Sequence, residues 1–408
     1  MSTVSPASEL LARLESVPFS KWHLRARIVM GSATFFDAFD ALALAFVLPV
    51  LVRQWGISSQ QIGWLIAIGY LGQFLGALIF GALAERTGRV RSAAAATALM
   101  SVMTLACAAT GNFTELIIVR LIQGIGVGGE MPVAAVYINE LSKARGRGRF
   151  FLLYEMIFPI GLMATGQIGA LLVPAFGWQI MFLIGGIPGL VVTLLLLRLP
   201  ESPRWLIGQG RLVEAERIIE QIEATTPERV DHGQATAKPE AIAGSLLSPL
   251  YRRRTLIVWS LWSCAYFVTN GLNNWMPTLY NRFYHLSLPD ALRAGTLTNV
   301  AQVALLLGCA FVIDRIGRRR WTTICFLAGA VLLAALATFA SHAGAAVIAL
   351  VTISYGLVGS VNAVLYLYTP EIYPTRMRAI GTGAATCWLD RKSTRLNSSH
   401  VSESRMPS

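Results

Sequence analysis

The sequence predicts an all-α protein that crosses a membrane many times, and three observations support this fold class. Of its 408 residues, 54% are apolar or aromatic and only 14% are charged, against roughly 25% charged residues in a soluble domain. The mean hydropathy is +0.56. Apolar stretches of the roughly 20 residues that a bilayer-spanning helix requires recur along the whole chain. This composition excludes a disordered chain, a disulfide scaffold and a typical cytosolic enzyme.

The apolar stretches predict six spans, a polar interval, four more spans and the start of an eleventh. The first six cover residues 28–52, 62–84, 92–109, 116–138, 150–173 and 179–197. The later ones cover residues 255–280, 297–313, 321–339 and 345–368, with an apolar start at 379–389. Backbone groups in lipid must be hydrogen-bonded within their own segment or within a closed barrel. Because the stretches are too long for barrel strands, we expect each to be a helix.

Five regions follow from this order of spans. Residues 1–27 form a cytoplasmic N-terminus without the apolar core of a signal peptide. A six-helix half (28–198) is joined by a polar linker (199–253), with a helical pattern at 212–222, to a second half (254–389) that is incomplete and reaches only the start of span eleven. Residues 390–408 are polar and Ser-rich. We interpret them as non-native sequence on a truncated chain; a genuine short cytoplasmic tail is the alternative.

The basic residues gather in alternate loops, which accounts for the formal net charge of +12. They precede span one, separate spans two and three, four and five, and eight and nine, fill the linker, and follow span ten. The positive-inside rule places the N-terminus and the linker in the cytoplasm, and we expect a protein of the bacterial inner (plasma) membrane. Nucleic-acid binding would need this charge on one soluble face with aromatic side chains among it. We therefore expect the lipid bilayer as a partner and no nucleic acid.

The cysteines and histidines show no ligand pattern. The five cysteines lie in apolar stretches without a CxxC pair, and the five histidines are dispersed. We therefore expect no metal ion and no other cofactor. The sequence also contains no nucleophile–base set, so we do not expect an enzyme.

Two loop motifs of the first half of the chain are repeated in the second half, at nearly the same distance along the sequence. The segment from Glu85 to Arg89 is repeated 229 positions later from Asp314 to Arg318, and Glu140 is repeated 231 positions later at Glu371. Each glutamate is followed five residues later by an arginine. This recurrence indicates a duplicated half, and duplicated halves around a midplane site are the layout of secondary transporters.

These motifs resemble the signature loops of the major facilitator superfamily. Residues 120–129 resemble its fourth-helix motif, and residues 200–204 and 370–376 are similar to motifs of its sugar-porter and metabolite:proton symporter branches. The aromatic-acid and nicotinate branch is indicated by residues 36–40, 128–134 and 275–278. Ala38, where that branch carries Gly, and Glu85, where Asp is usual, depart from the pattern. The resemblance implies a fold of two six-helix halves, here with about 10–11 spans.

Charged residues inside predicted spans are candidate proton-coupling groups, because a charge in hydrocarbon is costly and usually faces a cavity or a partner. Asp37 and Asp40 lie three residues apart on one helical face, and two carboxylates in a low dielectric do not readily both ionise. We favour Asp40 as the deeper; the alternative is that one aspartate is merely solvated. Glu130 is a second candidate. It lies about 15 Å along the helix from Arg120, so we expect Arg120 to face Asp40 instead.

Polar and aromatic side chains in the fifth, seventh and tenth spans are candidate substrate-binding residues. Amide groups beside a planar apolar wall suit a small aromatic or heterocyclic carboxylate; hydrogen bonding between helices is the competing interpretation. By the resemblance, Tyr366 falls where related porters place a substrate-stacking aromatic residue. The full set is Glu155, Asn270, Asn273, Asn274, Trp275, Asn362 and Tyr366.

The charged loop motifs are candidate cytoplasmic gates. Opposite charges at the cytoplasmic ends of the spans can bridge the two halves, close the inside and separate when it opens. The set is Gly81, Glu85, Arg86, Gly88, Arg89, Glu140, Arg145, Glu201, Arg204, Asp314, Arg315, Gly317, Arg318, Glu371, Arg376 and Arg378.

Together these features predict a secondary active transporter, expected to be a monomer. It would carry a small organic acid, aromatic or heterocyclic, together with protons by alternating access. A sugar facilitator or sugar:proton symporter is the alternative, and several Gln and Asn side chains in the site would favour it. A membrane sensor that does not transport is an alternative from another class.

Overall fold

The computed structural model describes residues 6–142, 146–225, 245–282, 288–339 and 344–386, and the regular structure in these ranges is helical. A last described helix covers 378–386. The tail predicted at 390–408 lies outside the described residues. The other helices are α1 (Pro6–Ser16), α2 (Lys21–Trp55), α3 (Ser59–Thr87), α4 (Arg89–Ala108), α5 (Phe113–Leu141), α6 (Arg147–Glu155), α7 (Ile157–Phe176), α8 (Gln179–Leu196), α9 (Pro203–Gly208), α10 (Leu212–Ala224), α11 (Arg252–Arg282), α12 (Leu288–Ile316), α13 (Arg318–Phe339), α14 (Gly344–Ile372) and η1 (Thr375–Met377).

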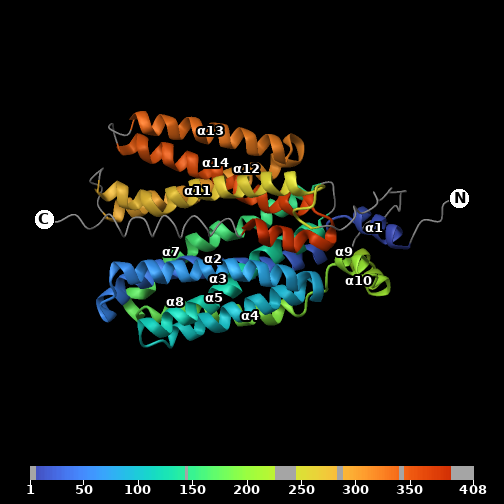
Figure 1. Cartoon of the computed structure of the whole chain (residues 1–408), viewed down its shortest axis with the longest axis horizontal. Helices are drawn as coiled ribbons and strands as arrows, with labels where there is room; N and C mark the ends of the chain where they lie inside the picture. Colours follow the sequence, from blue (N-terminus) through green and yellow to red (C-terminus); the bar gives the residue numbers. More distant parts are fainter. Residues whose placement is uncertain (1–5, 143–145, 226–244, 283–287, 340–343, 387–408) are drawn as a thin grey trace.

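The long helices lie side by side in two groups (Figure 1). Helices α2 to α8, blue to green, form one group, and α11 to α14, yellow to red, form the other. The groups meet where α12 contacts α6 and α7 and where α14 contacts α5 and α6. Helices α1, α9 and α10 lie beyond the ends of the long helices, at the end that also holds the N-terminus. We call this the linker end.

Eight helices in the described ranges are long and apolar enough to cross a membrane. They match the second to sixth and the eighth to tenth predicted spans. Helices α2 and α11 cover the first and seventh. The prediction of an all-α membrane protein is confirmed.

The fifth predicted span is broken into two helices. Pro159 has no backbone N–H, and its ring clashes with the carbonyl four residues earlier, that of Glu155. Helix α6 accordingly ends at Glu155, and α7 begins at Ile157. The Glu155 carboxyl therefore lies at an interruption of the transmembrane segment.

Glycines allow α3 and α5 to pack with their backbones in contact. A Cβ on Gly72 would meet the backbone of Leu121 and Gly124, and a Cβ on Gly128 would meet the backbone of Gln73. Small residues at helix crossings are typical of membrane proteins, because close approach maximises van der Waals contact. This packing holds α5, which carries the candidate charged residues Arg120, Glu130 and Glu140, firmly against α3.

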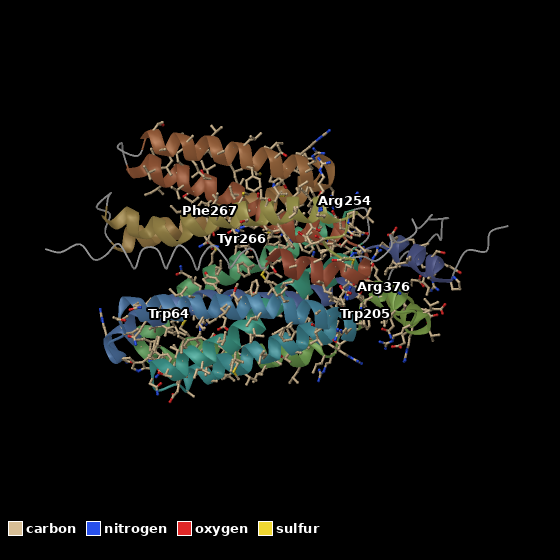
Figure 2. The ribbon with its side chains drawn as sticks, viewed as in Figure 1. Trp64, Trp205, Arg254, Tyr266, Phe267 and Arg376 are labelled. Atoms are coloured by element: carbon tan, nitrogen blue, oxygen red, sulfur yellow. The ribbon has the colours of Figure 1, made fainter. Side chains whose placement is uncertain are left out.

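Helices α1, α9 and α10 form a small apolar cluster at the linker end. Leu10 and Leu14 of α1 are buried against Ile219 of α10 and its neighbours, and Arg13 Nη2 lies 2.8 Å from Glu223 Oε2. The hydrogen bond to Glu223 raises the pKa of Arg13. Figure 2 labels Trp205 of α9 at this end. The pattern at 212–222 predicted α10, whereas α1 and α9 were not predicted.

Candidate functional site

A cavity of about 340 Å³ is lined by residues of both halves. Its charged lining residues, among those described, are Asp37, Arg120 and Glu155, which all belong to the N-terminal half. The C-terminal half contributes neutral side chains: Tyr266, Thr269, Asn270, Gln302, Tyr355, Asn362, Tyr366 and Thr386 are the polar ones. Ionisable groups on one wall and neutral hydrogen-bonding groups on the other can bind a ligand that has one charged end.

The two aspartates of α2 are both buried, with exposed fractions of 3% for Asp37 and 2% for Asp40, but they meet different neighbours. Asp37 lines the cavity. Asp40 lies within the N-terminal half, where its Oδ2 is 2.6 Å from the Thr104 hydroxyl of α4. The sequence favoured Asp40 as the deeper residue; in the structure the two are equally buried, and Asp37 is the one beside the cavity.

Arg120 and Asp40 are joined through a third side chain. Arg120 Nη1 donates to Gln123 Oε1 at 2.6 Å, and Gln123 Nε2 donates to Asp40 Oδ2 at 2.5 Å. Gln123 was not predicted as a site residue, although its position one helical turn after Arg120 is a readable signal. The chain of bonds links the cavity-lining guanidinium to the buried aspartate indirectly, through the Gln123 amide.

Glu130 lies outside the cavity lining and is fully buried. Its Oε1 accepts a 3.1 Å hydrogen bond from the Thr34 hydroxyl, which also lies 2.5 Å from the Tyr154 hydroxyl. Its Oε2 has no partner in the described part of the chain. The Thr34 and Tyr154 hydroxyl groups thus form a buried hydrogen-bonded chain that ends at Glu130, and Tyr154 is the sequence neighbour of the cavity-lining Glu155. Thr34 and Tyr154 were not predicted.

An aromatic group forms part of the opposite wall. The Trp262 ring stacks on Tyr266, with centroids 5.5 Å apart and planes 8° from parallel, and meets Tyr366 edge-on at 4.6 Å. Asn270 also lines this wall. The side chains of three other predicted residues, Asn273, Asn274 and Trp275, lie outside the described part of the structure.

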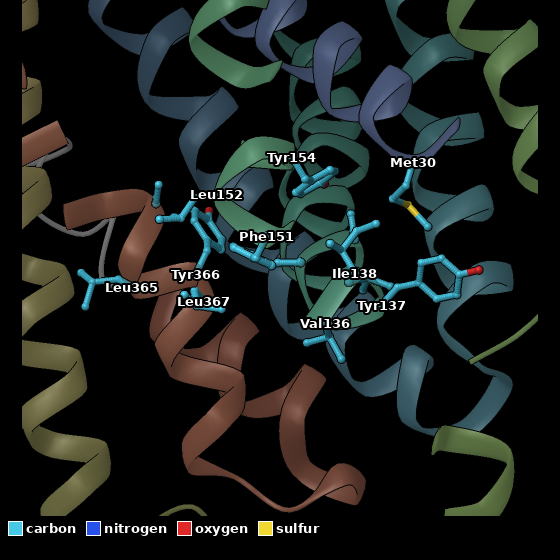
Figure 3. Packing of buried hydrophobic residues seen from close by; sticks show 14 of the residues in the cluster. Met30, Val136, Tyr137, Ile138, Phe151, Leu152, Tyr154, Leu365, Tyr366 and Leu367 are labelled. Carbon is cyan, nitrogen blue, oxygen red and sulfur yellow. The ribbon is translucent and has the colours of Figure 1, made fainter. Parts of the chain in front are cut away.

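Apolar side chains from both halves pack between the cavity and the linker end. Phe151 and Leu152 of α6 belong to one buried cluster with Tyr366 and Leu367 of α14, and Figure 3 shows these four side chains close together. Asn139 Nδ2 of α5 donates to the Leu367 carbonyl at 3.0 Å. The halves are therefore in direct contact through buried side chains on this side of the cavity.

Arg89 is the centre of an ion-pair network at the linker end. Its side chain is fully buried, with Nη1 2.9 Å from Glu85 Oε2 and Nη2 3.2 Å from Glu140 Oε1. Nη2 also donates to the Thr375 carbonyl of the other half at 2.8 Å. Glu85 Oε1 accepts the Ala379 N–H at 2.9 Å, near the start of the last described helix, where a negative charge complements the helix dipole.

The repeated motif makes the corresponding contacts in the second half. Asp314 accepts the backbone N–H groups of Gly148 and Arg149 at 3.0 Å each, at the N-terminus of α6. Arg318 pairs with Asp314 at 3.0 Å and with Glu371 at 3.1 Å. Each motif thus places an acidic side chain at a helix N-terminus of the opposite half, and the sequence repeat corresponds to a repeat of contacts.

Further predicted gate residues join the halves to each other and to the linker. Arg378 Nη1 lies 3.7 Å from Glu140 Oε1. Arg376 Nη2 donates to the Gly208 carbonyl of α9 at 2.8 Å, and Arg204 Nε donates to the Glu140 carbonyl at 2.9 Å.

The Glu201 carboxylate caps the N-terminus of α4. It accepts the N–H groups of Arg89 and Val90 at 2.8 and 3.1 Å. Burial raises the pKa of Glu201, and the amide donors partly oppose this. Gly88 has φ +106°, and a Cβ there would strike the Glu201 carboxylate. Only glycine fits this turn.

The remaining gate candidates have differing surroundings. Gly81 packs against Ala379, whose carbonyl oxygen would lie 3.0 Å from a Cβ at Gly81. Gly317 has φ +87°, a conformation that favours glycine. Arg86 and Arg315 are exposed. Arg145 lies outside the described residues.

Two helical halves around a shared polar cavity, with matching charged motifs at one end, are the arrangement that the loop motifs implied. The family model of the Major Facilitator Superfamily matches residues 30–390. The chain belongs to this superfamily. It is therefore an integral membrane transporter by family, as the sequence motifs indicated.

Similar proteins include transporters of small aromatic compounds. The niacin transporter NiaP of Acinetobacter baylyi is 33% identical over 385 residues, which cover 93% of this chain and 86% of that protein. The 4-hydroxybenzoate transporter PcaK of the same organism is 29% identical over 379 residues, 91% of this chain and 82% of that one. The solved structure of the proton:xylose symporter XylE has a TM-score of 0.78 at 20% identity, covering 94% of this chain and 90% of that one. This last likeness concerns the fold alone.

Proposed function

We propose that the chain is a secondary active transporter that couples uptake of a small aromatic or heterocyclic carboxylic acid to protons by alternating access. The observation that carries the proposal is the cavity with two carboxyl groups, Asp37 and Glu155, and one guanidinium, Arg120. An anion enters such a site more readily when the carboxyl groups are protonated, because like charges repel strongly in a low dielectric. Binding of the anion and binding of a proton would therefore favour each other.

In this proposal Arg120 holds the substrate carboxylate and transmits its presence to Asp40. The guanidinium is linked to Asp40 by Gln123, so a carboxylate that draws Arg120 into the cavity moves a positive charge away from Asp40. The loss of that nearby positive charge favours the neutral carboxyl at Asp40. Glu130 is the second proton acceptor, and the hydrogen-bonded Thr34 and Tyr154 hydroxyl groups are the proposed last part of its proton path.

The linker end would be the cytoplasmic gate. Its motifs are the basic loops that the positive-inside rule assigns to the cytoplasm, which would also place the N-terminus there, in a bacterial inner membrane. The contacts that cross between the halves would hold this end closed. They are the Arg147–Glu371 and Arg378–Glu140 ion pairs, the Arg89 hydrogen bond to the Thr375 carbonyl, and the carboxylate contacts to helix N-termini in the opposite half. Alternating access requires these contacts to separate while the far side closes.

A sugar carrier is the second candidate, favoured by the amide groups of Gln73, Gln302, Asn270 and Asn362 in the cavity lining. Binding of nicotinate, 4-hydroxybenzoate and glucose to the purified full-length chain in lipid nanodiscs separates the two candidates. We expect one or both aromatic acids to bind, with an affinity that falls as the pH rises from 5.5 to 8. Glucose binding without pH dependence would favour the sugar carrier and overturn the proposal.

A matched pair of variants tests the role of the cation. Arg120→Gln removes the charge inside the cavity, and Arg211→Gln removes a charge from an exposed pair with Glu214. Binding of the acids is expected to be lost in the first variant and unchanged in the second. Binding that survives in Arg120→Gln would show that another group holds the carboxylate.

A further inference from the structure

The amide of Asn362 is fixed in one orientation by its neighbour. The Thr269 hydroxyl has one hydrogen, which it donates to the Ala265 carbonyl at 3.0 Å. Towards Asn362, 3.2 Å away, the same oxygen can then only accept. The group of Asn362 that faces Thr269 must therefore be the NH₂, because the carbonyl oxygen could not donate to it. The direction of the amide is thus set by the hydrogen-bond arrangement.

This arrangement leaves an acceptor without a donor in a residue of the cavity lining. Asn362 Oδ1 is shielded from solvent and has no hydrogen-bond partner among the described residues, although both Asn362 and Thr269 line the cavity. A buried acceptor that lacks a donor is destabilising, because it has lost its hydrogen bonds to water and has gained none in the protein. A ligand that supplies an N–H or O–H group would relieve that cost, whereas a ligand that presents another acceptor would not.

The charges of the cavity determine which end of an aromatic acid can reach this acceptor. The lining cation is Arg120 on α5, and Asn362 lies on α14 of the other half. A carboxylate held by Arg120 turns the far side of its ring towards the C-terminal half. There Tyr366, with its edge-on contact to Trp262, provides an aromatic surface four residues from Asn362. A substituent on the ring, and not the carboxylate, is then the group that meets Asn362.

We propose that Asn362 is a specificity-determining residue that selects acids whose ring carries a hydrogen-bond donor, such as a phenolic hydroxyl, over acids without one. The inference rests on the proposed function, since it assumes that an aromatic acid occupies the cavity. 4-Hydroxybenzoate carries such a donor. Benzoate has none, and the ring nitrogen of nicotinate is an acceptor at neutral pH. Thr269 acts as a positioning residue, because it only holds the amide in place.

The test compares equilibrium binding of 4-hydroxybenzoate and benzoate to the full-length chain in lipid nanodiscs. We expect the parent to bind 4-hydroxybenzoate about tenfold more tightly, the upper range for one neutral hydrogen bond. In Asn362→Leu the two acids should bind about equally well, so the ratio of their Kd values falls to about one, and the Kd of benzoate should change by less than twofold. Thr269→Val frees the amide to turn and should narrow the preference, and Thr269→Ser, which keeps the hydroxyl, should preserve it.

The outcomes separate this inference from the proposed function. If both acids bind the parent equally, or if Asn362→Leu keeps the preference, the inference is wrong and the proposed function stands. If the parent binds neither acid, both are wrong. If Asn362→Leu loses both ligands through misfolding, Thr269→Val decides: an undiminished tenfold preference in that variant overturns the inference.

Discussion

Replacing Arg89 with methionine is expected to open the linker end. The guanidinium is fully buried and makes contacts of 2.9 Å to Glu85 and 3.2 Å to Glu140. It also donates to the Ala84 carbonyl at 2.7 Å and, across the boundary between the halves, to the Thr375 carbonyl at 2.8 Å. Methionine keeps an unbranched side chain but is shorter and offers neither charge nor donors, so every one of these contacts is lost.

The magnitude follows from these contacts. Removing one member of a buried ion pair typically costs about 3–5 kcal/mol, and we expect the lower end because Arg378 remains 3.7 Å from Glu140. Of these Arg89 contacts, only the charged hydrogen bond to the Thr375 carbonyl joins the two halves, so only its share of this free energy, about 1.5–3 kcal/mol, favours the closed state over the open state. At 1.4 kcal/mol per factor of ten, the population of the open state should rise by about 10- to 100-fold.

The assay is modification of a buried cysteine by a water-soluble maleimide. Leu367→Cys places a thiol in the apolar contact between the halves, in a background where the exposed Cys264 is alanine. Its labelling rate should rise at least tenfold with Arg89→Met and stay constant with Glu214→Gln, which disrupts only an exposed pair. A labelling rate within twofold of the parent, in folded Arg89→Met protein, would refute the role of Arg89 in closure.

Three further predictions concern packing, the linker-end cluster and pH. Gly128→Ala should lower Tm, with a loss of about 1–3 kcal/mol in unfolding free energy, because the added Cβ would meet the Gln73 backbone. The control Gly271→Ala, where a Cβ would have nothing within 4 Å, should leave Tm unchanged. Equal Tm values for the two variants would contradict the packing of α3 on α5. Leu14→Ala should weaken the packing of α1 on α10 by about 2–5 kcal/mol and so speed proteolysis of the N-terminus. The control Val213→Ala, at an 81% exposed position, should not change the cleavage rate. Equal cleavage rates in the two variants would count against packing of α1 on α10. The pKa of Glu201 is raised above its value near 4.5 in the unfolded chain, so the protonated carboxyl stabilises the fold at pH values below 4.5. This stabilisation is lost as the pH rises through the pKa of the folded state. The Tm of the parent relative to Glu201→Gln should therefore fall from pH 4 to 7, and a constant difference would be the contrary result.

Much of the fold could be predicted from the sequence because the bilayer imposes long apolar helices. The repeated loop motifs also predicted that the two halves make corresponding contacts. Glu85 and Asp314 occupy equivalent places at the start of a helix in the opposite half, where Glu85 accepts one backbone N–H group and Asp314 accepts two. Helices α1 and α9 were missed because they have 11 and 6 residues, too short for a strong periodic pattern, and their stability comes from packing on α10.

The candidate site was predicted less completely, because its geometry depends on which helices face each other. A three-residue spacing places Asp37 and Asp40 near one another on α2, but neighbouring helices decide that one meets the cavity and the other meets Thr104. Neutral connecting residues such as Gln123 and Thr34 carry no charge signal in a sequence. Their roles depend on α2, α4 and α5 coming together, which no local pattern specifies.

The most direct test of proton coupling is uptake of labelled 4-hydroxybenzoate into vesicles that contain the full-length chain, with and without an inward proton gradient. The proposal predicts that the gradient stimulates uptake, and that Asp40→Asn abolishes the stimulation because the carboxyl behind Arg120 can no longer exchange a proton. An ionophore that dissipates the gradient should have the same effect on the parent. Uptake that is independent of the gradient, or stimulation that persists in Asp40→Asn, would contradict the account.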